Sequence, residues 1–78
     1  MKLKATEKNF NRLAYQYDLD VYEHNHEFSL FNNKTNEILF EHIPDMQTVI
    51  KETVDVFNYN IQRNRYDKTN ANTMFNYY

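Results

Sequence analysis

The sequence contains no glycine and one proline, so nearly every sharp turn has to be made by residues that carry a Cβ atom. Asparagine is the residue that best replaces glycine at left-handed turn positions. Phosphate-binding loops and dinucleotide-binding turns need glycine where the backbone approaches the ligand closely. We therefore predict that the chain lacks both kinds of loop and that it turns at its asparagines.

A chain of 78 residues is expected to form one domain. A domain of this size buries only about 60% of the surface of its unfolded chain. It has no cysteine for disulfides or thiolate metal sites, but it has seven tyrosines and six phenylalanines. The sequence thus predicts a small core built from aromatic residues, without a cofactor.

The first helix is predicted over about residues 7–17. Thr6 can cap its N-terminus, and Glu7 suits the positive end of the helix dipole. Apolar residues then recur at helical spacing, at Phe10, Leu13, Ala14 and Tyr17. Asp18 is a poor helix former and is expected to end the helix.

Residues 19–42 are predicted to form three antiparallel strands separated by two turns. The first turn is a two-residue loop at Asn25 and His26, which pairs Val21 with Leu30. The second turn covers residues 33–36 and is predicted as a three-residue hairpin loop with Asn36 in the left-handed conformation.

The second turn sets Leu30 opposite Phe40, and the pairing gives the sheet two faces. The inner face, expected to pack on the helices, holds Leu19, Val21, Phe28, Leu30, Ile38 and Phe40. The outer face holds Tyr22, His24, Ser29, Phe31, Leu39 and Glu41.

A second helix is predicted to open at Pro44 and Asp45 and to reach about residue 64. The predicted fold class is therefore α+β in the order αβββα, a three-stranded antiparallel meander with two helices packed on one face. Residues 1–66 are assigned to this domain. Residues 67–78 are assigned to a C-terminal tail that is polar at first and aromatic at its end.

Residues for catalysis and metal binding are sparse. Ser29 is the single serine and the carboxylates are scattered, so the chain is predicted not to be an enzyme. The group most similar to a metal site consists of Glu23, His24, His26, Glu27, Glu41 and His42. Because His26 falls in a turn, we interpret this group as a polar hairpin tip that titrates near neutral pH, without a metal.

Aromatic residues on the outer sheet face and in the tail form the first candidate binding surface. Exposed aromatic side chains on a sheet favour contacts with another protein or with a second copy of the chain. Alternatively, the tail folds back and covers the sheet. The predicted partner-binding residues are Tyr22, Phe31, Leu39, Phe75, Tyr77 and Tyr78.

The end of the second helix is the alternative surface, for nucleic acid. Arginine and lysine bind phosphates, and tyrosine stacks on bases. The residues are Arg63, Arg65, Tyr66 and Lys68, helped by Lys2 and Lys4. The net charge of −2 favours the plainer interpretation of a solvated helix end.

The αβββα order over about residues 6–64 is similar to that of the double-stranded-RNA-binding domain. That family places lysines at the start of its second helix, where they grip phosphates. The matching positions here are Asp45, Met46, Gln47 and Thr48, so no binding residue is carried over.

The chain is rich in Asn, Lys and Tyr. Two segments are typical of this composition: Leu19–Tyr22, which follows a short helix, and Phe31–Glu37. In this respect the chain resembles small accessory proteins of phages and other mobile elements of low-GC bacteria. The resemblance implies a non-enzymatic protein that binds a host protein and modulates or inhibits it. No apolar run is long enough to span a membrane and none follows the N-terminal lysines, so a cytoplasmic location is expected.

Overall fold

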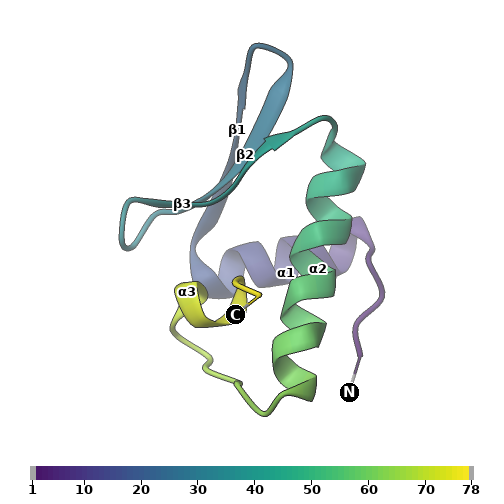
Figure 1. Cartoon of the computed structure of the whole chain (residues 1–78), viewed down its shortest axis with the longest axis vertical. Coiled ribbons are helices and arrows are strands. Elements are labelled where there is room, and N and C mark those ends of the chain that lie inside the picture. Colours follow the sequence, from purple (N-terminus) through teal and green to yellow (C-terminus); the bar gives the residue numbers. More distant parts are fainter. Residues whose placement is uncertain (1, 78) are drawn as a thin grey trace.

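The computed structural model of the chain describes residues 2–77. Its elements are α1 (Glu7–Tyr17), β1 (Leu19–His24), β2 (Glu27–Asn32), β3 (Glu37–Ile43), α2 (Met46–Gln62) and α3 (Ala71–Met74). The strands form one antiparallel sheet in the order β1-β2-β3. Figure 1 shows α1 and α2 crossing each other on one side of this sheet. The predicted α+β class and αβββα order are confirmed, and the short helix α3 is added to them.

The helix ends follow from their capping residues. The N–H of Asn9 donates to Thr6 Oγ1 over 3.2 Å and starts α1. The N–H of Thr48 donates to Asp45 Oδ1 over 2.7 Å and starts α2, and this bond lowers the pKa of the Asp45 carboxyl. Asp18 ends α1 in the left-handed conformation. The predicted start and end of α1 are therefore confirmed.

The first hairpin has the predicted two-residue loop. Asn25 and His26 both have positive φ, at 52° and 64°, which is the backbone of a type I′ turn. Val21 lies opposite Leu30, as predicted. Asn36 is left-handed as predicted, but the second loop spans four residues, 33–36, instead of three.

Strand β3 contains a bulge that changes which residues face the helices. Leu30 lies opposite Phe40, as predicted, but Phe31 lies opposite Ile38, so Leu39 is an extra residue. Ile38 is turned to the outer face with 56% of its surface exposed, and Leu39 packs partly buried against the core. The predicted places of Ile38 and Leu39 were wrong because the alternation of a strand changes phase at a bulge.

A second register shift lies nearer the end of β3. Phe28 is opposite Ile43, and Leu30 is opposite Phe40, so the strand gains another residue between these pairs. His42 absorbs the extra length in the left-handed conformation, with φ at 61°. Both Phe40 and Ile43 consequently pack with the core.

The centre of the core is Tyr17 at the end of α1. Its ring meets the ring of Phe75 edge-on at 5.2 Å and that of Phe57 at 6.3 Å. Its hydroxyl donates to the carbonyl oxygen of Asp67 over 2.8 Å, and burial raises the pKa of the Tyr17 phenol. This buried tyrosine joins α1, α2 and the segment that follows α2.

The segment predicted to be a tail supplies part of the same core. Phe75 is only 1% exposed, and Ala71 and Met74 are buried with it. Phe75 fills the space between Tyr17 and Phe57, so the described part of the predicted tail, residues 67–77, folds back on the helices.

Two buried asparagines of α2 hold the segments before α1 and after α2. Asn58 Oδ1 accepts from the N–H of Leu3 over 2.9 Å, and Asn58 Nδ2 donates to the carbonyl of Leu3 over 2.8 Å. Asn60 Nδ2 donates to the carbonyls of Met74 and Asn76 over 3.0 and 2.8 Å. These amides serve the fold, and they are not free to contact a ligand.

Candidate binding surfaces

The outer face of the sheet is the first candidate surface. The rings of Tyr22 and Phe31 meet edge-on with their centroids 5.5 Å apart. Ile38 lies opposite Phe31 on the neighbouring strand and extends the apolar patch. Tyr22 is 52% exposed, and the helices lie on the other side of the sheet (Figure 1). We call Tyr22, Phe31 and Ile38 the outer patch.

The segment that builds most of the sheet, residues 18–42, is strongly acidic. No strand contains lysine or arginine, and Lys34 in the second loop is the single basic residue between positions 18 and 42. The same span has six carboxylates, which give a net charge of −5 with histidine neutral: Asp18, Asp20, Glu23, Glu27, Glu37 and Glu41. The outer patch is therefore set in a negative field.

His26 and His42, which the sequence analysis placed in one polar group, lie in different parts of the sheet. His42 Nδ1 lies 3.2 Å from Glu27 Oε1, and His42 Nε2 lies 3.9 Å from Glu41 Oε2. The bond to Glu27, followed by the charges of Glu27 and Glu41, raises the pKa of His42. His26 is held in the turn of the first hairpin.

The six residues predicted to bind a partner do not form one surface. Tyr22 and Phe31 lie together, but Leu39 and Phe75 contribute to the core. Tyr77 is exposed and its ring lies 5.4 Å from that of Tyr59 on α2. Tyr78 lies outside the described residues. Ile38 was missed because strict alternation placed it on the inner face.

A groove between α1 and α2 is the second candidate surface. Its volume is about 650 Å³, and residues of the N-terminal segment, both helices and the chain after α2 line it. Apolar side chains form part of it, namely Leu3, Leu13, Phe57 and Ile61. The polar lining residues are Arg12, Gln16, Asn64 and Tyr66.

The predicted nucleic-acid residues are only partly gathered at this groove. Tyr66 lines it, with 55% of its surface exposed. Arg65, which precedes Tyr66 in the sequence, is partly buried, and Lys68 is exposed. The guanidinium of Arg63 lies instead over the ring of Tyr59, 5.3 Å from its centroid.

Within residues 2–77, no group of three or more His, Asp or Glu side chains is arranged to hold a metal ion. Ser29, the single serine, is paired with Tyr22 in the sheet and is partly buried.

None of the helices described has the length and apolar character needed to cross a membrane. Comparison of the chain with models of protein families, with curated proteins and with solved structures gives no match.

Proposed function

We propose that the chain is a non-enzymatic protein-binding module that contacts its partner through the outer patch. The observation that carries this proposal is the Tyr22–Phe31 ring pair, which lies on the uncovered sheet face with Ile38 beside it. Tyrosine and phenylalanine bury a large area with little loss of side-chain freedom, and such residues concentrate binding energy in protein interfaces.

The acidic surroundings define the chemistry of the partner. A partner with an apolar centre and a rim of lysine or arginine complements both the outer patch and the carboxylates around it. The resemblance to accessory proteins of phages and mobile elements supports a partner in a host cell whose activity the chain modulates or inhibits. We take Tyr22, Phe31 and Ile38 as the contact residues.

The test is affinity capture from a lysate of a low-GC bacterium, followed by binding measurements with the purified partner. A variant with Tyr22→Ala and Ile38→Lys removes an aromatic anchor and introduces a charge that repels a basic rim. We expect its affinity to fall by at least about tenfold, which corresponds to roughly 1.4 kcal/mol. Tyr15→Ala is the matched control, because Tyr15 lies on α1 and is 92% exposed.

The control variant should bind like the unchanged chain. Equal capture of the same proteins by the Tyr22→Ala, Ile38→Lys variant would contradict the proposal. Sedimentation of the purified chain measures its oligomeric state and so tests whether a second copy of the chain binds the outer patch. A dimer that the same double variant dissociates would assign the outer patch to self-association and would also contradict a contact with a host protein.

A further inference from the structure

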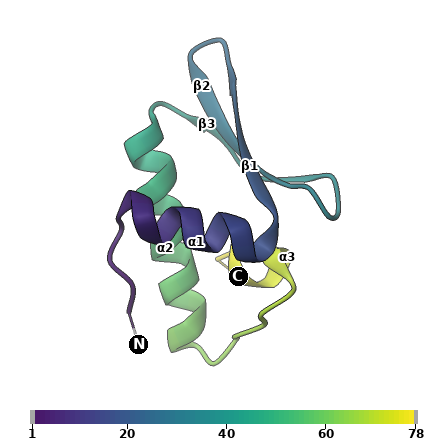
Figure 2. The same ribbon diagram turned by 180° about the vertical axis from the view of Figure 1, so that it is seen from behind.

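We propose that the groove between α1 and α2 binds single-stranded nucleic acid, independently of the protein contact at the outer patch. The site differs from the run of residues at the end of α2, because the structure adds Leu3 of the N-terminal segment and Arg12 and Gln16 of α1 to Tyr66. Figure 2 shows these segments around one region of the molecule, away from the first hairpin.

The cations near the groove have no partners among the carboxylates of residues 2–77. Within residues 2–77, the salt bridges are those of Lys51 and His42, and none involves Arg12, Arg65 or Lys68. The side chains of Arg12 and Lys68 are exposed, so a phosphate can reach both of them. The chain is acidic as a whole, but residues 18–42 carry its acidic excess, so residues 1–17 and 43–78, which supply every residue lining the groove, have a net charge of +3.

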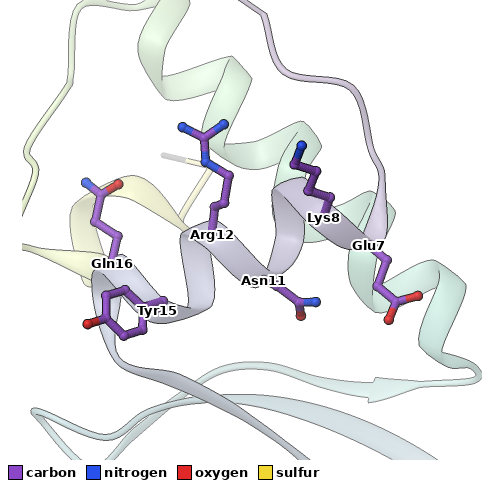
Figure 3. Close-up of a pocket in the computed structure, with 6 residues that line it drawn as sticks. All are labelled: Glu7, Lys8, Asn11, Arg12, Tyr15 and Gln16. Atoms are coloured by element: carbon purple, nitrogen blue, oxygen red, sulfur yellow. The ribbon is translucent and has the colours of Figure 1, made fainter.

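A row of side chains on α1 extends the groove into a track. Lys8, Arg12 and Gln16 project from one side of the helix, whereas Tyr15 projects from the other (Figure 3). Arg12 and Gln16 line both the groove and the adjoining shallow surface of α1, which Lys8 and the carboxylate of Glu7 also line. Lys8 and Arg12 are separated by four positions, so their charges repel, and a phosphate between them relieves this repulsion.

The groove itself matches the other parts of a nucleotide. Tyr66 offers an exposed ring on which a base can stack, next to the apolar side chains of Leu13 and Ile61. The amide of Asn64 carries a donor and an acceptor suited to base edges, and Gln16 offers its Oε1 as an acceptor, while its Nε2 donates to the carbonyl of Lys68 over 3.4 Å. Stacking needs an unpaired base, so these features favour a single strand over a duplex.

We favour a single strand of nucleic acid over a free nucleotide as the ligand, because the cation Lys8 lies beyond the groove. The volume of about 650 Å³ suits one nucleotide or two. Lys8 on the shallow surface lies outside the lining of the groove, so a single nucleotide held there leaves it without a phosphate. A strand of several nucleotides engages Arg12 and Lys8 together.

The test is fluorescence anisotropy of a labelled ten-nucleotide single strand with the full chain at several salt concentrations. We expect the logarithm of the affinity to fall with the logarithm of salt with a slope of about 2, since each of about three phosphate contacts contributes roughly 0.7. Tyr66→Leu should weaken binding by at least about fivefold through lost stacking. Arg12→Ala should weaken it by about three- to tenfold.

Two matched controls separate the groove from general charge and general aromatic contact. Lys34→Ala removes the same charge from the second hairpin loop, and Tyr22→Leu removes an aromatic ring from the outer patch. Both should bind the strand like the unchanged chain. Arg12 and Tyr66 are exposed, so circular dichroism should show both variants folded.

Three results would overturn the inference. The first is no binding at low salt, and the second is an equal loss of affinity in Lys34→Ala and Arg12→Ala. The third is adenosine monophosphate binding as tightly as the ten-nucleotide strand, which would assign the groove to a single nucleotide. None of these results bears on capture by the outer patch, so the two proposals fail separately.

Discussion

Asn60 Nδ2 donates a hydrogen bond of 3.0 Å to the carbonyl oxygen of Met74, and Asn60 is fully buried. The same amide also donates to the carbonyls of Val56 and Asn76. One side chain in the last turns of α2 therefore holds α3 and the residue after Phe75. Burial of this amide is compensated at Nδ2, which donates to backbone carbonyls, whereas the buried Oδ1 has no hydrogen-bond partner within residues 2–77.

Asn60→Ala is expected to destabilise the fold, because it removes the amide donor from the carbonyl of the buried residue Met74. Leaving a buried acceptor unpaired costs about 1–3 kcal/mol of unfolding free energy. Urea unfolding followed by circular dichroism measures this loss. The control is Gln62→Ala, an exposed position in the same helix, which should change the unfolding free energy by less than about 0.5 kcal/mol. Equal midpoints for the two variants would show that the amide bonds contribute little.

Phe75→Ala should cost about 3–5 kcal/mol of unfolding free energy, because it empties the space between Tyr17 and Phe57. Chemical denaturation checks the size of this loss, and Phe75→Leu is a milder variant that keeps most of the volume. Tyr15→Ala serves as the aromatic control, since Tyr15 is almost wholly in solvent. An unchanged denaturation curve for Phe75→Ala would mean that the last segment does not belong to the core.

The bulge in β3 predicts opposite effects for two neighbouring residues. Ile38→Ser changes an exposed side chain and should alter the unfolding free energy by less than about 1 kcal/mol. Leu39→Ser removes apolar area that packs on the core and should cost clearly more, on the order of 1–2 kcal/mol. Thermal or urea unfolding of both variants decides this. A larger loss of unfolding free energy for Ile38→Ser than for Leu39→Ser would contradict the bulge and support a regular strand with Ile38 on the inner face.

The contact between His42 and Glu27 predicts a shifted titration. The pKa of His42 in the folded chain is raised above its ordinary value of about 6.5. The stabilisation from this contact is therefore complete below about pH 6.5 and is lost as the pH rises through the folded pKa. An NMR titration of the His42 ring measures this pKa, which should fall in Glu27→Gln and stay in place in Glu23→Gln. A His42 pKa that Glu27→Gln leaves unchanged would rule out the contact.

Elements governed by local rules were predicted closely from the sequence. Thr6 and Asp18 mark the two ends of α1 because capping and helix propensity act within one turn. The two-residue loop at Asn25 and His26 was predicted together with the pairing of Val21 and Leu30, because loop length fixes the register of a hairpin. The pair of Tyr22 and Phe31 on the outer face depends on this register alone, which is why that part of the candidate surface was found.

Features that depend on distant contacts were not predicted. The apolar run Ile38-Leu39-Phe40 satisfies either face of a strand, so no local signal fixes the bulge at Leu39. Asn58 and Asn60 have the composition of a polar helix surface, and only their partners at Leu3 and Met74 make them internal. The groove was missed for the same reason, because Arg12 and Tyr66 are brought together by tertiary packing.

The placement of Phe75 in the core sets the order in which the chain can mature on the ribosome. Synthesis adds roughly 5–20 residues per second, so Phe75 follows the end of α2 by about a second. During that interval Tyr17 and Phe57 lack one of their ring partners, and the nascent helices expose an apolar seam. The seam closes only when residues 71–75 pack against α1 and α2.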